Sequence, residues 1–149
     1  MTDYKMIIDG RKVGADDTFP VLNPATEEVV AQCPRASAAQ VDEAVAAARR
    51  AFPAWSATSD SERSAMVHAI ADKIEAHGEE LAQLLTLEQG KPVSGFAGMG
   101  AGWEIGGTLA WCHATADLEL PVEVIQDNDE ARIEVHRKPL GVVGSITPW

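Results

Sequence analysis

The stretch Gly141-Val142-Val143-Gly144-Ser145-Ile146-Thr147-Pro148-Trp149 decides the fold class that the sequence predicts. Its apolar side chains form a short, nearly continuous run, which is typical of a strand covered on both faces. Such strands belong to parallel sheets flanked by helices. Ligands bind outside the carboxyl ends of these strands. We therefore predict an α/β fold in which residues 146–149 lie where a cofactor docks.

Composition limits the classes of partner that this chain can have. The 149 residues carry a net charge of −11, and clustered Lys and Arg are absent. Nucleic acids and anionic membranes bind basic surfaces, so neither is expected as a partner. No run approaches the ~20 apolar residues of a membrane span, and no leader pattern opens the sequence. We therefore expect a cytoplasmic protein, in which Cys33 and Cys112 are reduced thiols.

Residues 4–33, near the start of the chain, are predicted to form short antiparallel strands. Asp9-Gly10 lies between Met6-Ile7-Ile8 and Arg11-Lys12-Val13, and this dipeptide between two such runs is a strong hairpin signal. A second pair of strands is predicted on either side of a turn at Asn23-Pro24-Ala25-Thr26, over residues 19–22 and 29–33.

Two amphipathic helices are predicted next. Ser37-Ala38-Ala39-Gln40 and Ser59-Asp60-Ser61-Glu62 both have the spacing of a capping box, which satisfies backbone N–H groups at the start of a helix. The first helix is predicted to stop at Pro53, and the second at His77-Gly78. The second helix carries one apolar stripe, formed by Met66, Ile70 and Ile74.

Two further helices complete a helical block over residues 37–116. A helix is predicted over residues 79–87, and Gly90 suits the left-handed position after its end. Pro92 suits the first turn of a last helix over residues 93–115. This helix is apolar nearly all round and should be buried on most sides. Each of its glycines costs up to about 1 kcal/mol relative to Ala, so packing must compensate.

An antiparallel hairpin is predicted over residues 118–138. Apolar residues alternate with polar ones from Leu118 to Val124, Asp127-Asn128-Asp129-Glu130 forms a polar turn, and the alternation resumes at Arg132. A lone two-stranded ribbon is at best marginally stable in water. We therefore expect this hairpin to pair with another sheet or another subunit.

Three motifs lack the spacing that their chemistry needs. Gly90-Lys91 lacks the first glycine and the Ser or Thr of a phosphate-binding loop. The glycines of residues 95–107 follow a helix rather than a strand, unlike a dinucleotide fingerprint. Cys112 and His113 point about 100° apart on a helix, which favours core packing over a nucleophile and its base. The sequence offers no catalytic set, and no pair of its histidines has metal-ligand spacing, so no metal site is expected.

Four segments in the right order resemble one family over nearly the whole chain. They are Asn23-Pro24-Ala25-Thr26, residues 41–55, Leu87-Glu88-Gln89-Gly90-Lys91-Pro92, and residues 138–149. Together they resemble the amino-terminal portion of the NAD(P)-dependent aldehyde dehydrogenases. The resemblance implies three domains, for cofactor binding, catalysis and oligomerisation. Residues 1–117 would then be the amino-terminal part of the cofactor domain, 118–138 the oligomerisation hairpin, and 139–149 the first strand of a Rossmann-like sheet.

The resemblance also carries over a small set of functional residues. Ile146, Thr147, Pro148 and Trp149 match the family segment that lines the cleft for NAD or NADP, largely through backbone atoms. Family chemistry proceeds by thiolate attack on the aldehyde, hydride transfer and thioester hydrolysis. The family's Cys nucleophile, Glu base and oxyanion-binding Asn have no match in this sequence. We therefore expect the isolated chain not to oxidise aldehydes.

Three hypotheses about function remain open. The leading one is a piece of a longer aldehyde dehydrogenase that is a homo-oligomer through the 118–138 hairpin. The second is a stand-alone interaction protein that joins full-length dehydrogenase subunits through the same hairpin. The third is one half of a split enzyme, whose other half supplies the Cys and Glu.

Overall fold

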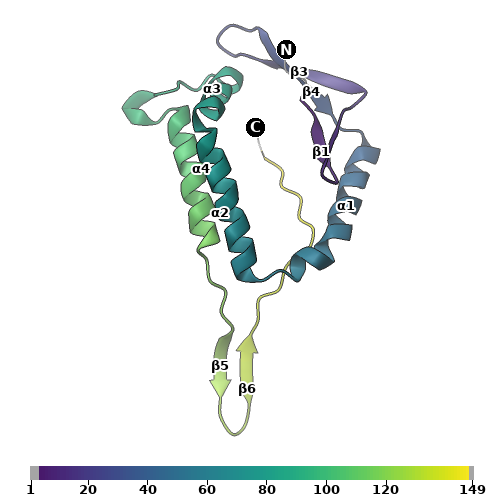
Figure 1. Cartoon of the computed structure of the whole chain (residues 1–149), viewed down its shortest axis with the longest axis vertical. Helices are drawn as coiled ribbons and strands as arrows, with labels where there is room; N and C mark the ends of the chain where they lie inside the picture. Colours follow the sequence, from purple (N-terminus) through teal and green to yellow (C-terminus); the bar gives the residue numbers. More distant parts are fainter. Residues whose placement is uncertain (1–3, 148–149) are drawn as a thin grey trace.

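The computed structural model describes residues 4–147 as three small hairpins and a block of helices (Figure 1). The elements in chain order are β1 (Met6–Ile8), β2 (Arg11–Val13), β3 (Asp17–Leu22), β4 (Val29–Arg35), α1 (Ala38–Ser56), α2 (Asp60–Ala76), α3 (Gly78–Gln89), a 3-10 turn (Phe96–Gly98), α4 (Ala101–Ala116), β5 (Glu123–Asp127) and β6 (Arg132–Val135). The chain is thus a mixture of helices and short strands, as the sequence predicts.

The strands pair only with their neighbours in sequence. They form three separate antiparallel two-stranded sheets, β1 with β2, β3 with β4, and β5 with β6. Asp9 and Gly10 both have positive φ, at 53° and 72°, as the tight turn of the first hairpin requires. In the second hairpin, the Asn23 side chain accepts a hydrogen bond of 2.9 Å from the Ala25 backbone nitrogen. Both predicted hairpins are confirmed.

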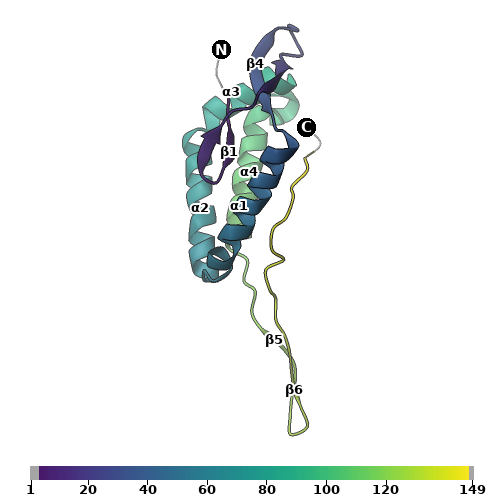
Figure 2. The same ribbon diagram turned by 90° about the vertical axis from the view of Figure 1, so that its right-hand side faces the viewer.

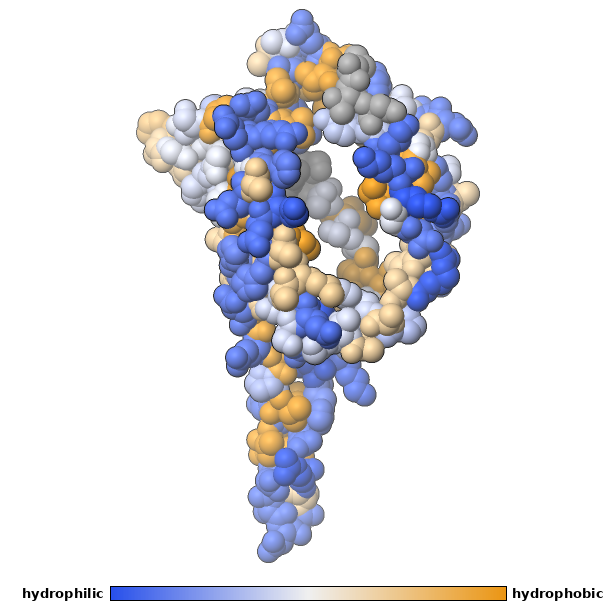
Figure 3. Space-filling model, viewed as in Figure 1, coloured by the Kyte–Doolittle hydropathy of each residue, from blue (hydrophilic) through white to orange (hydrophobic). Residues whose placement is uncertain are grey.

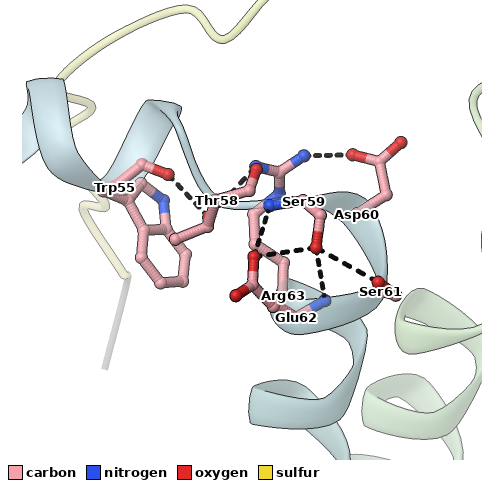
Figure 4. Close-up of polar contacts among 7 residues, drawn as sticks. All are labelled: Trp55, Thr58, Ser59, Asp60, Ser61, Glu62 and Arg63. Atoms are coloured by element: carbon pink, nitrogen blue, oxygen red, sulfur yellow. Dashed lines mark hydrogen bonds and ion pairs between the residues drawn. The ribbon is translucent and has the colours of Figure 1, made fainter.

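Both predicted capping boxes are formed. Ser37 Oγ accepts from the Gln40 nitrogen at 3.2 Å, and Gln40 Oε1 accepts from the Ser37 nitrogen at 3.0 Å. At the start of α2, Ser59 Oγ accepts from the Glu62 nitrogen at 3.2 Å, and Glu62 Oε2 accepts from the Ser59 nitrogen at 2.8 Å (Figure 4). These reciprocal bonds satisfy backbone donors that a helix start leaves without partners.

The end of α1 differs from the sequence prediction. The helix does not stop at Pro53 but continues through it to Ser56. Proline lacks one N–H donor, and here the loss falls in the last turn, so few bonds lie beyond it. The Ser56 hydroxyl donates to the Pro53 carbonyl oxygen at 3.0 Å and helps to close this turn.

The start of the last helix also differs. Instead of one helix from residue 93, the chain forms a loop, and α4 begins only at Ala101. Gly95 and Gly98 have φ of +52° and +80°, which a right-handed helix does not contain. A Cβ on Gly95 would lie 2.6 Å from the Gly100 nitrogen, so the loop is folded tightly on itself. The helix prediction for residues 93–100 was therefore wrong: it relied on their apolar composition, whereas the glycines make this stretch a loop.

Small residues fill the contacts among the helices. Side by side, α2 and α4 form the main helical pair, with α3 across one end (Figure 1). Alanines are the buried residues here: Ala71, Ala82, Ala101 and Ala116. The prediction that the last helix is buried on most sides is wrong, because Trp111 is 76% exposed and Trp103 is also exposed. Only one side of α4 has a partner among residues 4–147.

The β5–β6 hairpin projects away from the helices in both views (Figures 1 and 2). Its strands begin at Glu123 rather than at Leu118, and Asn128 at the turn accepts from the backbone nitrogens of Glu130 and Ala131, both at 3.0 Å. The antiparallel hairpin is confirmed in its pairing and turn. Its two connecting arms carry it well clear of the helical block.

The predicted strand after residue 140 is not formed. Residues 140–147 run as an extended segment with no strand assignment, and Val143 and Ile146 are exposed. A strand needs a neighbour to accept its backbone hydrogen bonds. No other segment of residues 4–147 pairs with it as a strand. In Figure 2 it runs alongside the helices.

Candidate functional site

The predicted cofactor segment lies at the end of this extended run. The Ile146 side chain is 96% exposed, and Thr147 follows it on the same exposed backbone. Pro148 and Trp149, the other two predicted residues, lie outside the described residues. The structure therefore places Ile146 and Thr147 among the exposed residues.

The chemistry that Ile146 and Thr147 can perform is limited to binding. Neither side chain titrates near neutral pH, so neither can act as a general acid or base. Extended backbone offers N–H donors and carbonyl acceptors in alternation, which suits the orientation of a bound molecule. The expectation that this segment lines a cofactor cleft stays a prediction.

The candidate nucleophile Cys112 is not paired with its neighbour. Cys112 is half-buried on α4, and the His113 ring turns to α2, where its Nδ1 lies 3.0 Å from His68 Nδ1. Cys33 is half-buried on β4 and lines a hollow beneath α3 with Leu84 and Leu87. Both cysteines are free thiols, and both have the surroundings that the sequence analysis expected.

Lys91 has a structural partner. Its ammonium group forms an ion pair with the Glu104 carboxylate on α4. This pair ties the loop after α3 to the first turn of α4, where a carboxylate is favoured by the helix dipole. The contact gives Lys91 a role in holding the loop, in agreement with the rejection of a phosphate-binding loop.

Two carboxylates have perturbed acidity. Backbone and side-chain hydrogen bonds from Ser59 hold the pKa of Glu62 below its ordinary value. Hydrogen bonds from Arg132, and then from His136, lower the pKa of Glu134 on β6. Both carboxylates are on the surface, Glu62 in the capping box of α2 and Glu134 on β6. Neither is close to Ile146 in the sequence, and neither belongs to a catalytic cluster.

The described part of the chain contains neither a metal-binding cluster of three or more side chains nor a membrane-spanning helix. Over residues 4–147, no group of three or more His, Cys, Asp or Glu side chains is placed to hold a metal ion. No helix in this range is long and apolar enough to cross a membrane.

One side-chain cluster escaped the sequence analysis. His68 on α2 contacts both His113 on α4 and Asp117 at the end of α4. These contacts join residues 45 and 49 positions apart, so local spacing could not reveal them. The only available signal was the i,i+4 spacing of His113 and Asp117, which places them on one helix face.

Apolar side chains of α2 are left uncovered by residues 4–147. The face of the molecule in Figure 3 is mostly polar, with smaller apolar areas near its upper end and on the projecting hairpin. Met66 and Ile70 on α2 are exposed, and with Ile74 and Leu81 they line a shallow apolar hollow. The residues of α2 that pack on α4 are small or polar, such as Ala71 and His68. The predicted stripe of Met66, Ile70 and Ile74, hereafter the α2 stripe, therefore exists but has no partner among residues 4–147.

The total surface area measures how much of the chain is uncovered. A compact monomer of 15.9 kDa exposes about 7,400 Å². This chain exposes 11421 Å². The excess of about 4,000 Å² is far larger than the area that one ordinary protein interface buries on a single partner.

Comparisons with known proteins agree with one another. The aldehyde dehydrogenase family model matches residues 12–149. A probable aldehyde dehydrogenase of a Pseudomonas species is 42% identical over 147 residues, which cover 98% of this chain and 29% of that protein. The crystal structure of an NAD-dependent benzaldehyde dehydrogenase from Corynebacterium glutamicum has a TM-score of 0.75 at 30% identity, over 84% of this chain and 27% of that one. An NADP-dependent enzyme of E. coli has a TM-score of 0.79 at 27% identity, over 88% of this chain and 27% of that one.

These matches confirm the family resemblance seen in the sequence motifs. The chain spans less than a third of the length of these relatives, and the matches extend over most of the chain itself. The hairpins and helices correspond to solved structures of the same fold. This chain belongs to the aldehyde dehydrogenase family.

Proposed function

We propose that this chain is part of an NAD(P)-dependent oxidoreductase that converts an aldehyde to a carboxylic acid, and that the isolated chain is inactive. The observation that carries the proposal is the family match over residues 12–149. The large exposed area supports it, because more polypeptide is needed to cover surfaces such as the α2 stripe. The cytoplasmic location expected from the sequence belongs to the same proposal.

Within this enzyme, residues 146–149 line the cofactor cleft. The exposure of Ile146 and Thr147 supports this role. Solved relatives of both the NAD-dependent and the NADP-dependent kind share the fold of this chain. The proposal therefore leaves the choice between the two cofactors open.

A chimera tests the proposal directly. Residues 1–149 replace the matching segment of the Pseudomonas relative, and NAD(P)H formation is followed with a panel of aldehydes. We expect the chimera to be active and the 149-residue chain alone to form no NAD(P)H. Ile146→Arg in the chimera should raise the KM for the cofactor at least about tenfold, or about 1.4 kcal/mol, by obstructing the cleft. Asp16→Arg, at an exposed residue outside the 118–138 hairpin, serves as the control. A folded chimera without activity would contradict the proposal.

A second role, as an oligomerisation module, is favoured by the projecting β5–β6 hairpin (Figure 2). Strand partners Glu123–Val135 and Gln126–Ile133 place Ile133 and Val135 on one face. Arg132 and Glu134 lie on the opposite face, where they form an ion pair. A ribbon that exposes Ile133 and Val135 on one face, beside the polar Glu123 and Gln126, and has two unpaired edges suits association with a second copy or with a full-length subunit.

Mixing experiments separate the open hypotheses. Tagged chain is combined with a full-length family member and captured. Co-purification without gain of activity supports the hypothesis that the chain is a stand-alone interaction protein. Aldehyde-dependent NAD(P)H formation only after addition of a polypeptide that carries the missing Cys and Glu supports the split enzyme.

A further inference from the structure

His68 on α2 and His113 on α4 bring two imidazole rings together across the main helical pair. Their Nδ1 atoms lie 3.0 Å apart, and the ring centroids lie 5.2 Å apart with 35° between the planes. Two nitrogens bound to one tetrahedral zinc ion, each at 2.0–2.1 Å, are about 3.3 Å apart. To share one ion the rings need to separate by about 0.3 Å and also to tilt, because the two Nδ1 atoms point at each other, whereas their lone pairs would meet at about 109° on a tetrahedral ion.

Asp117 supports this geometry from behind. Its Oδ1 lies 3.1 Å from His68 Nε2, the nitrogen that faces away from His113. A carboxylate there accepts the Nε2–H, which leaves the lone pair on His68 Nδ1 and fixes the orientation of the ring. The Asp117 backbone nitrogen also donates to the His113 carbonyl oxygen at 3.0 Å, so one helix turn holds both residues.

The surroundings leave room for further ligands. The His68 side chain is 38% exposed, and the Asp117 side chain is more exposed still. Water molecules can reach the positions that protein ligands do not fill, and the net charge of −11 attracts cations to the chain.

We propose that His68 and His113 form a two-histidine site for a divalent transition metal ion of the zinc class, with Asp117 orienting His68. The ion bonds to both Nδ1 atoms and to water. The proton between the two nitrogens is lost from Nδ1 to solvent when the ion binds, and His113 takes one proton from solvent at Nε2, so both rings stay neutral and no net proton is released. Imidazole ligands favour zinc, copper and nickel over magnesium, which prefers oxygen. The bound ion fastens α2 to α4. This inference does not depend on the proposed dehydrogenase function.

Calorimetric titration of the 149-residue chain with zinc chloride tests the site. We expect one zinc ion per chain and no heat with magnesium chloride. His68→Ala and His113→Ala should each weaken zinc binding more than tenfold. Asp117→Ala should weaken it about tenfold, as is usual for the partner of a metal-bound imidazole. Circular dichroism checks that the helices are retained.

The other two histidines provide matched controls. His77 lies beside Glu80 at 3.2 Å, and His136 lies beside Glu134 at 2.9 Å, so both also have a carboxylate partner. His77→Ala and His136→Ala should leave zinc binding unchanged. Equal weakening by all four substitutions, unchanged binding in the His68 and His113 variants, or no binding by the unsubstituted chain would overturn the proposal.

A measurement on the unsubstituted chain guards against variants that do not fold. Imidazole carbon-bound proton resonances of His68 and His113 should shift together as zinc is added, while those of His77 and His136 stay in place. Shifts confined to His77 or His136 would contradict the site.

Discussion

Gly90 ends α3 in the left-handed conformation and packs directly on the ring of Pro24. Its φ is +73°, and a Cβ built on Gly90 would lie 2.7 Å from Pro24 Cγ. This contact joins two of the segments that carry the family resemblance, the Asn23-Pro24-Ala25-Thr26 turn and the Leu87–Pro92 segment. The glycine is therefore required both by the backbone and by its neighbour.

Gly90→Ala should destabilise the chain through both effects. The left-handed backbone costs an alanine about 1–2 kcal/mol, and displacement of the Pro24 ring adds about 1–3 kcal/mol. Gly10 is the matched control, since its φ is +72° but nothing lies within 4 Å of a Cβ there. Gly10→Ala should lose only the backbone part. Urea unfolding of the three proteins measures the difference, and equal losses would contradict the contact with Pro24.

Gly106→Ala should stabilise the isolated chain. Gly106 lies inside α4, and no atom lies within 4 Å of the position of its Cβ. Alanine in a helix interior is favoured over glycine by about 0.5–1 kcal/mol. Thermal unfolding should therefore move to higher temperature. In the active chimera the same substitution tests whether the rest of the enzyme approaches this face of α4, because a close partner would turn the gain into a loss.

The two capping boxes should respond differently to pH. The pKa of Glu62 lies below its ordinary value of 4.5. Its stabilising effect is therefore complete above pH 4.5 and disappears as the pH falls through the lower folded-state value. The destabilisation caused by Ser59→Ala should shrink in acid. Gln40 does not titrate, so Ser37→Ala should cost about 1 kcal/mol at every pH. Chemical unfolding of dilute samples at pH 7 and pH 3 measures both, and parallel behaviour of the two variants would refute this account of Glu62.

The two faces of the β5–β6 hairpin can be tested separately by substituting one residue on each face, chosen for equal exposure. Val124 and Ile133 are each 47% exposed, but Val124 pairs with Glu134 and so lies on the opposite face from Ile133. If copies associate through the hairpin face that carries Ile133 and Val135, Ile133→Asp should dissociate them and Val124→Asp should not. Light scattering after size-exclusion chromatography measures the mass of each. Dissociation by Val124→Asp alone would place the contact on the opposite face, that of Val124, and would contradict this prediction.

Sequence reasoning succeeded wherever the signal was local. The Asp9-Gly10 turn, both capping boxes and the helix end at Gly90 each depend on the conformational preferences of a few adjacent residues. It failed at residues 93–100, where apolar composition was given more weight than the glycines that fold the loop.

Non-local structure was beyond the reach of the sequence alone. The strand predicted at Val142 and Val143 requires a neighbour, and a pattern of apolar residues cannot supply one. The contact of His68 with His113 depends on how two helices pack, so spacing along the chain gave no indication of it. The family motifs succeeded because they summarise such packing for a whole class of proteins.

The separate two-stranded sheets have a consequence for handling the protein. In a two-stranded sheet each strand pairs on one side only, so all six strands among residues 4–147 keep an open edge. Open edges are templates for aggregation, which natural proteins limit by charge. Here the protection is the net charge of −11, which vanishes near the isoelectric point of 4.6. Precipitation with gain of intermolecular β-structure is therefore expected as the pH is lowered toward that value. Salt screens the charge, so precipitation should begin at a higher pH when salt is added.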